Sequence, residues 1–308
     1  MTANITYDMP FNEYCKIDAI NSHAIMAGCY PQTIRHMAAY LLGGHETDKR
    51  AWKLGRAIHS KILEPDTFHK EWRLSLPCDG IYGKDSKKAG QKCGKYASHW
   101  DGSRWLCGVH SGDTPAIANV IDQGELARVL AIEKELSEAG QLAQFRRRGW
   151  SECVITFELM GLPCKARLDR LPEDKSMVID FKKVRPGHAT LEAFQKQVAE
   201  LLYHVQAWFY CEAVKAVSGS YPSFIWVIAE DDIPHCVNVI MASNFDLKVG
   251  RHLGQTVLSE YKRLLNGEAP RGYLGPHVAI GALPQWYARR YAEIDIGADF
   301  AAESNLPF

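Results

Sequence analysis

Two aspartates and a lysine lie on either side of a short turn. Asp169 precedes Pro172, while Asp180 and Lys182 follow Ser176. If the turn runs from Pro172 to Ser176, the antiparallel register sets Asp169 almost opposite Asp180, and strand alternation puts Lys182 on the same face. Like charges in opposed positions repel unless a cation lies between them. The hairpin therefore predicts a site for Mg²⁺ or Mn²⁺ that bridges carboxylates to a phosphate oxygen, with Lys182 beside the attacking water of phosphodiester hydrolysis.

These three residues alone would also fit a solvated hairpin with scattered charges, because short patterns arise by chance. The neighbouring segments extend the hairpin to a three-stranded antiparallel meander, predicted over residues 152–159, 164–171 and 177–184. Glu152 then lies close to Asp169 across the first hairpin. It could bind a second cation or water, or it could be a solvated residue at a strand edge.

Helical patterns flank this meander. Residues 1–75 are predicted to be mostly helical, and His59 lies beside the apolar stripe of the strongest helix there. Tyr203, Gln206 and Tyr210 are spaced by three and four residues, so they share one side of a later helix. The remaining predicted elements are helices over 114–145, 190–217 and 245–265 and strands over 223–229 and 236–241.

Composition indicates a soluble globular protein. The 308 residues are 46% hydrophobic and 23% charged, which suits one large domain or one domain with an inserted module. Lysine plus arginine equals aspartate plus glutamate, at 36 each, so a nucleic-acid enzyme of this composition must concentrate its positive charge locally. Arg167 and Lys183 are candidates for that charge. No export signal or apolar span is visible, and we expect a cytoplasmic protein that does not enter a membrane.

A polar segment over residues 77–113 lacks apolar periodicity and contains spaced cysteines. Nine cysteines in a chain without an export signal favour metal binding or burial over disulfides. Four residues have the ligand chemistry of a closed tetrahedral zinc site, with His99 as a competing ligand: Cys78, Cys93, Cys107 and His110. A structural metal would offset the entropy of ordering such a segment. The alternative is an irregular loop with reduced thiols.

The order of helix, three antiparallel strands with acids and a lysine, helix and strand resembles the core of the PD-(D/E)XK nuclease superfamily. Four segments together resemble the exonuclease VIII (RecE) nuclease domain and its phage relatives: LGRAIHSKILEP around His59, CKARLD ending at Asp169, DFK from Asp180 to Lys182, and YHVQAWFY from Tyr203 to Tyr210. The likeness implies an α/β fold, with an α+β mixed sheet and a restriction-endonuclease-like core. We expect an N-terminal helical part (1–76), an inserted module (77–113), the nuclease core (114–270) and a C-terminal extension (271–308).

The resemblance also implies roles for single residues. His59, Asp169 and Asp180 match metal-binding positions, and Lys182 matches the lysine that positions or deprotonates the water. Gln206 and Tyr210 match an element that supports the site and contacts DNA near the scissile phosphate. Without the resemblance, these last two would be ordinary helix-face residues.

The implied function is a magnesium-dependent deoxyribonuclease. The resemblance implies a 5′ to 3′ exonuclease that acts on double-stranded DNA and produces single-stranded tails for phage or prophage recombination. It also implies that the enzyme is a homo-oligomer and that a single-strand annealing protein is its partner. One alternative is a structure-specific or single-strand nuclease that uses the same site. Another is a catalytically inert, zinc-containing protein that binds DNA or another partner.

Overall fold

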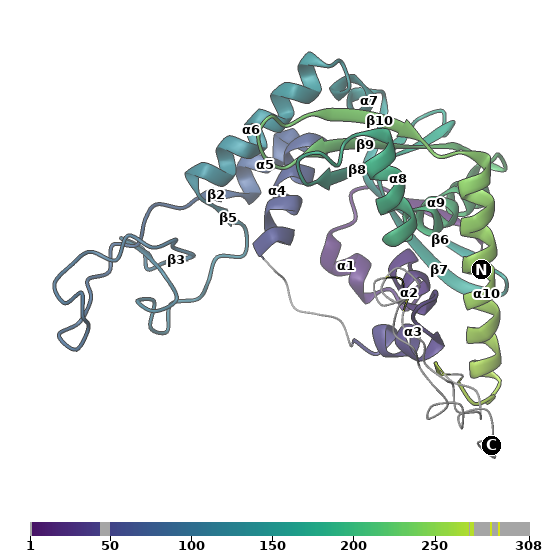
Figure 1. Cartoon of the computed structure of the whole chain (residues 1–308), viewed down its shortest axis with the longest axis horizontal. Helices are drawn as coiled ribbons and strands as arrows, with labels where there is room; N and C mark the ends of the chain where they lie inside the picture. Colours follow the sequence, from purple (N-terminus) through teal and green to yellow (C-terminus); the bar gives the residue numbers. More distant parts are fainter. Residues whose placement is uncertain (1, 44–49, 271, 274–283, 285–288, 290–308) are drawn as a thin grey trace.

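A six-stranded mixed sheet forms the centre of the computed structural model (Figure 1). Its strands lie in the order β1 (Asn4–Thr6), β6 (Gly149–Leu159), β7 (Leu162–Pro172), β8 (Met177–Val184), β9 (Ser223–Glu230) and β10 (Val237–Met241). All neighbours are antiparallel except β8 and β9, which are parallel. The structure describes residues 2–43, 50–270, 272–273, 284 and 289, so the predicted C-terminal extension lies almost entirely outside the described residues.

Helices cover both faces of this sheet and define two apolar cores. The first core includes residues of α2 (Ser22–Gly28), α3 (Ile34–Leu41), α8 (Leu191–Glu200), α9 (Tyr203–Ser218) and α10 (Asn244–Leu265). The second includes residues of α4 (Arg50–Leu63), α5 (Pro65–Glu71), α6 (Gln123–Glu138) and α7 (Leu142–Arg146). The short α1 (Phe11–Lys16) contributes no buried residue. The expected α/β fold class with a mixed sheet is confirmed. Among the described residues, no helix is long and apolar enough to cross a bilayer.

The central strand β8 is buried on both faces, which fixes the orientation of its polar residues. Val178 and Val184 belong to the first core, and Ile179 and Phe181 to the second. Because side chains alternate along a strand, Asp180 and Lys182 point toward the α9 layer.

Two of the predicted helices were wrong in extent. Residues 190–217 form α8 and α9 in place of one helix, because Leu202 has φ of 58° and turns the chain between them. Residues 114–145 begin without a helix. α6 starts only after Asp122, whose carboxylate accepts the N–H of Glu125 in a capping box.

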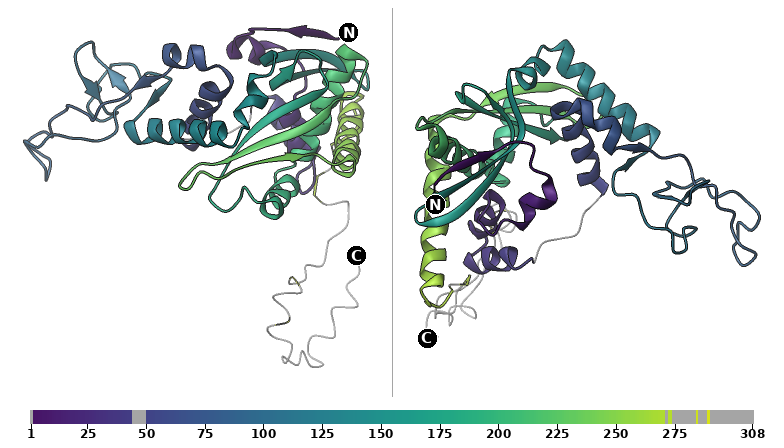
Figure 2. Two further views of the ribbon diagram at one scale, coloured as in Figure 1. Left: turned by 90° about the horizontal axis from the view of Figure 1, so that it is seen from above. Right: turned by 180° about the vertical axis from the view of Figure 1, so that it is seen from behind.

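The cysteine-containing segment projects from the helical layer next to α4 and α6, as Figures 1 and 2 show. A parallel pair, β2 (Arg73–Leu74) and β5 (Val120–Ile121), closes its base. Within it, β3 (His99–Trp100) pairs with β4 (Trp105–Leu106). Its small core consists of Cys78, Ala97, Trp105, Leu106, Cys107 and Val120. So small a core gives the segment little hydrophobic stabilisation of its own.

Candidate active site

The two aspartates meet where β7 and β8 pair. Arg170 lies opposite Ile179, and Asp169 and Asp180 each adjoin one member of this pair. The carboxylate of Asp169 accepts the backbone N–H of Phe181 at 2.8 Å, a role that a strand carbonyl fills in an ordinary ladder. This bond fixes Asp169 against β8.

Three potential metal ligands gather around Asp169. One ligand atom each of His59, Glu152 and Asp169 lies within 4.8 Å of the other two. The Nδ1 atom of His59, from α4, is 3.7 Å from Oδ2 of Asp169. Glu152 has φ of 52°, which interrupts the alternation of β6 opposite Asp169. Its side chain is only 17% exposed, so the alternative of a solvated edge residue does not fit.

Asp180 lies outside that group of three and is paired with Lys182. The carboxylate of Asp180 is 2% exposed, and its Oδ2 atom is 2.6 Å from Nζ of Lys182. Lys182 also donates to Oε1 of Gln206 at 3.0 Å, and Gln206 donates to the hydroxyl of Tyr210 at 3.2 Å. The ammonium lies 4.8 Å from the ring centre of Tyr203. The predicted stripe on α9 therefore holds Lys182 in place.

The titration behaviour of these groups follows from their burial. Burial, reinforced by the charge of Asp169, raises the pKa of Glu152 to about 8. Burial likewise raises the pKa of Asp180 to about 6 and that of Asp169 above its ordinary value. Burial is the main cause that lowers the pKa of His59 to about 4, and the charge of Lys182 adds to it. The imidazole is therefore uncharged at neutral pH and can act as a metal ligand. The raised pKa values mean that the positive charges around these carboxylates do not fully offset the effect of burial on their ionised forms.

That donor set fits a hard divalent cation. Carboxylate oxygens with one imidazole suit Mg²⁺ or Mn²⁺, and a cation among them would favour the ionised carboxylates. Although burial opposes it, the charges of Asp180 and Asp169 raise the pKa of Lys182. Lys182 therefore stays cationic, which favours positioning of water or phosphate over proton abstraction.

The sequence did not predict the role of Arg167 beside the site. Its Nε atom is 3.0 Å from Oε2 of Glu152, and its guanidinium lies 5.1 Å from the ring centre of Phe11 in α1. Arg167 thus holds Glu152. Lys183, the other candidate for phosphate contact, is instead paired with Asp231 at 2.5 Å. The sequence did contain a signal for this pair. Arg167 lies two residues before Asp169 and on the same strand face as Glu152 of β6, so the two side chains could have been expected to form an ion pair.

The four predicted zinc ligands also converge, with one ligand atom of each within 4.8 Å of the others: Cys78, Cys93, Cys107 and His110. Sγ of Cys93 is 3.8 Å from Sγ of Cys107, and Nδ1 of His110 is 3.5 Å from the sulfurs of Cys78 and Cys107. A tetrahedron with Zn–S bonds of about 2.3 Å has S–S edges of about 3.8 Å. The N–H groups of Gly80 and Cys107 point to Cys78 Sγ, as they would to a thiolate.

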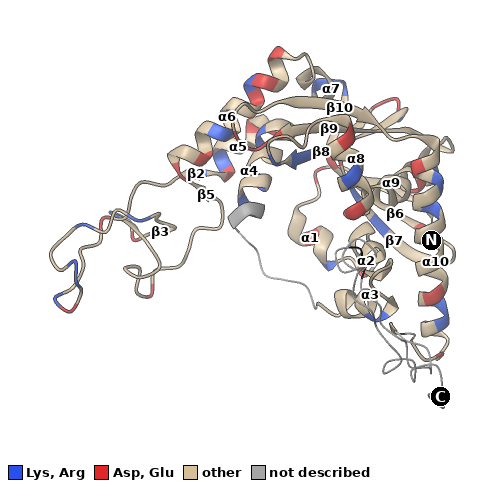
Figure 3. Cartoon of the chain, viewed as in Figure 1, with Lys and Arg blue, Asp and Glu red and all other residues tan. Residues whose placement is uncertain are grey.

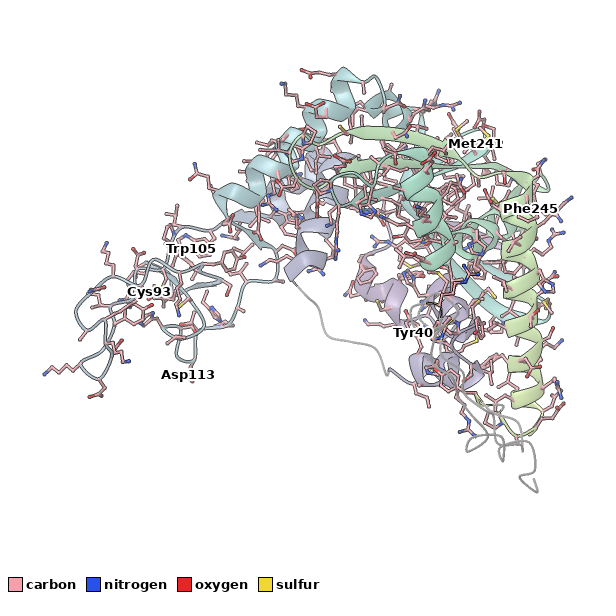
Figure 4. All side chains as sticks on the ribbon, in the orientation of Figure 1. Tyr40, Cys93, Trp105, Asp113, Met241 and Phe245 are labelled. Carbon is pink, nitrogen blue, oxygen red and sulfur yellow. The ribbon has the colours of Figure 1, made fainter. Side chains whose placement is uncertain are left out.

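The competing ligand His99 is not a member of this cluster. Its Nδ1 atom lies 3.1 Å from the hydroxyl of Ser98. The cluster lies in the projecting segment, where Figure 4 labels Cys93 near Trp105. It is therefore separate from the carboxylates at β7 and β8.

Comparison with known proteins agrees with this fold. No curated protein matches the chain. A crystal structure from Eubacterium rectale, named "Putative exonuclease", has a TM-score of 0.56 and 16% identity, covering 94% of this chain and 100% of that one. At this identity the likeness shows the fold alone. The family described as "PDDEXK-like domain of unknown function (DUF3799)" matches residues 30–275. The predicted PD-(D/E)XK resemblance is thereby confirmed, and the chain belongs to this PDDEXK-like family.

Proposed function

We propose that this protein is a divalent-cation-dependent deoxyribonuclease that hydrolyses phosphodiester bonds. The observation that carries the proposal is the cluster of His59, Glu152 and Asp169 beside the Asp180 and Lys182 pair. Membership of a PDDEXK-like family supports a nuclease of this superfamily.

The proposed roles follow from the contacts of each side chain. His59, Glu152 and Asp169 would hold a Mg²⁺ or Mn²⁺ ion, with Asp180 as a further ligand from the facing strand. When bound, such an ion polarises a phosphate oxygen and lowers the pKa of water. Lys182 holds the attacking water or stabilises the negative charge that develops on the phosphate.

Gln206 and Tyr210 act through Lys182. The amide oxygen of Gln206 accepts from Nζ of Lys182, while its NH₂ group donates to Tyr210. Because one end of the amide is fixed by Tyr210, its oxygen stays directed at the ammonium. These two residues are therefore positioning residues.

Within this class, we favour a 5′ to 3′ exonuclease on double-stranded DNA that makes single-stranded tails for phage or prophage recombination. Its support is the resemblance of the sequence motifs to exonuclease VIII. The same resemblance supports a cytoplasmic homo-oligomer that works with a single-strand annealing protein.

The test compares linear duplex, closed circular duplex and single-stranded DNA with Mg²⁺ or Mn²⁺. An exonuclease degrades linear duplex and leaves closed circles intact, and end-labelling gives its polarity. Cleavage of circles, or of single strands alone, would favour the structure-specific or single-strand nuclease. Asp180→Asn should abolish hydrolysis, whereas Asp66→Asn, a change at an exposed aspartate of α5, should not. Equal activity of wild type and Asp180→Asn would refute the site, and an inactive wild type would favour the inert binding protein.

We also propose that Cys78, Cys93, Cys107 and His110 bind a structural Zn²⁺. The interatomic distances given above support this assignment. The purified protein should contain about one zinc per chain. Cys107→Ser should lose most of it, while Cys211→Ser, at a buried cysteine of α9, should retain it. Equal zinc content in both variants would exclude the site.

A further inference from the structure

Residues 77–96 form an irregular two-stranded ribbon in the projecting segment, which we call the lysine ribbon. Pro77 lies opposite Tyr96, and Ile81 opposite Lys92, as antiparallel bridges. Backbone bonds continue the pairing, since Tyr82 N–H donates to the Gln91 carbonyl at 3.1 Å. Residues 83–90 form the turn at its tip.

The ribbon concentrates positive charge in a chain that is neutral overall. It carries Lys84, Lys87, Lys88, Lys92 and Lys95 against only two acids, Asp79 and Asp85. All five lysines are exposed. The structure gives their ammonium groups no carboxylate partner among the residues that it describes. Figure 3 shows blue Lys and Arg positions along this segment. These cations are therefore available to a partner.

The base of the ribbon is fixed to the helix that carries the active-site histidine. Lys53 of α4 donates to the hydroxyl of Tyr96 at 2.6 Å, and that hydroxyl donates to the Val120 carbonyl at 2.8 Å. His59 follows Lys53 by six residues, which is about 9 Å along a helix axis. That distance equals the rise of roughly three base pairs of B-DNA. A duplex in the active site would therefore pass near the base of the ribbon.

Cys78 and Cys93 come from the two strands of the ribbon, one from each. The other two members of the cluster, Cys107 and His110, come from the segment after the ribbon. Gly80 also belongs to this arrangement, because a Cβ there would lie 2.4 Å from the His110 ring. A metal at this cluster would lock both strands to the rest of the projecting segment.

We propose that the lysine ribbon binds the phosphate backbone of duplex DNA that enters the active site. This inference rests on the proposed nuclease function. Lysines act as point charges on phosphates and do not select a base sequence, which suits an enzyme that acts on any sequence. An acidic protein partner is the competing occupant. DNA is favoured because the base of the ribbon is fixed to α4, the helix that also carries His59 of the proposed phosphodiesterase site.

The test measures binding of a labelled blunt duplex as a function of salt, in an Asp180→Asn background that prevents cleavage. The ribbon variant is Lys84→Gln/Lys87→Gln/Lys88→Gln. The matched control is Lys134→Gln/Lys215→Gln/Lys248→Gln, at exposed lysines of α6, α9 and α10. Each lost phosphate contact lowers the magnitude of the slope of log K against log[salt] by about 0.9. We expect the ribbon variant to lose about 2 to 3 units of slope and roughly 10- to 100-fold in affinity at low salt.

An unchanged slope and affinity in the ribbon variant, with zinc content equal to wild type, would overturn the inference. If the triple variant loses zinc, Lys87→Gln alone must lower the slope by about 0.9, and no change would overturn the inference. A wild type that fails to cleave DNA while the ribbon variant still weakens binding would refute only the nuclease function.

Discussion

The pairing of Asp180 with Lys182 predicts a pH-dependent loss of stability when the lysine is removed. In Lys182→Met, the buried carboxylate of Asp180 loses a cation 2.6 Å away. Burial raises the pKa of Asp180 to about 6, and the charge of Lys182 keeps it from rising further. Without Lys182, that pKa must rise further, so Asp180 is protonated in the folded variant over a wider pH range.

The sign of the effect follows from proton linkage. An aspartate has a pKa of about 3.9 in the unfolded chain. Because the folded pKa is higher, the contribution of Asp180 to stability is fully present below the unfolded pKa and is lost as the pH rises to and through the folded pKa. In Lys182→Met the loss continues to higher pH than in wild type. The two proteins therefore diverge between about pH 6 and pH 8.

The magnitude follows from the burial of the pair. Removal of one partner of a buried pair costs about 3 to 5 kcal/mol when the other stays charged, and each pKa unit corresponds to about 1.4 kcal/mol. Proton uptake by Asp180 limits the cost at low pH. We therefore expect Lys182→Met to lower the free energy of unfolding by about 3 kcal/mol near pH 8 and about 1 kcal/mol near pH 6.

The assay is urea unfolding near both pH values, without added divalent cations and without chelators. The control is Lys196→Met, at an exposed lysine of α8, which should change stability little at either pH. The double variant Asp180→Asn/Lys182→Met should recover most of the stability near pH 8 while remaining inactive, since no charge is left unpaired. An equal stability loss at both pH values, or a double variant no more stable than Lys182→Met, would refute the reasoning.

Three further predictions concern the neighbours of the two sites. Gln206→Leu removes the oxygen that accepts a hydrogen bond from the ammonium of Lys182 at 3.0 Å, and a hydrogen bond to a charged group contributes about 1.5 to 3 kcal/mol. We therefore expect kcat to fall roughly 10- to 100-fold with little change in KM, and an unchanged kcat would contradict the positioning role. Arg167→Met removes the cation that lowers the pKa of Glu152, so Mn²⁺ titrations should show weaker binding, most clearly near neutral pH; equal affinity would contradict that coupling. Gly80→Ala places a Cβ against the His110 ring and should lower zinc content, whereas Gly83→Ala, with no heavy atom within 4 Å, should not; equal zinc in both would contradict the close approach.

Local sequence patterns predicted the strands that carry the site. The segment over 177–184 matches β8 at both ends, and the turn before it follows Pro172 as expected. The alternation of β-branched and polar residues is a property of neighbouring positions, so it can be recognised without a structure. The spacing of Tyr203, Gln206 and Tyr210 likewise predicted that they share a helix face. The same local reasoning extended one helix through Leu202, where a positive φ, invisible to periodicity, divides it.

The sequence alone established which residues can do chemistry: acids and a lysine on paired strands, a histidine on a helix, and cysteines with a histidine in a polar segment. Only the tertiary structure decided how they are grouped. It placed Glu152 beside His59 and Asp169 and paired Asp180 with Lys182. It also brought Cys78 into contact with His110, which lies 32 positions later in the chain. Strand pattern and residue type are local, whereas these distances depend on how separate elements pack, and packing is set by the whole core at once.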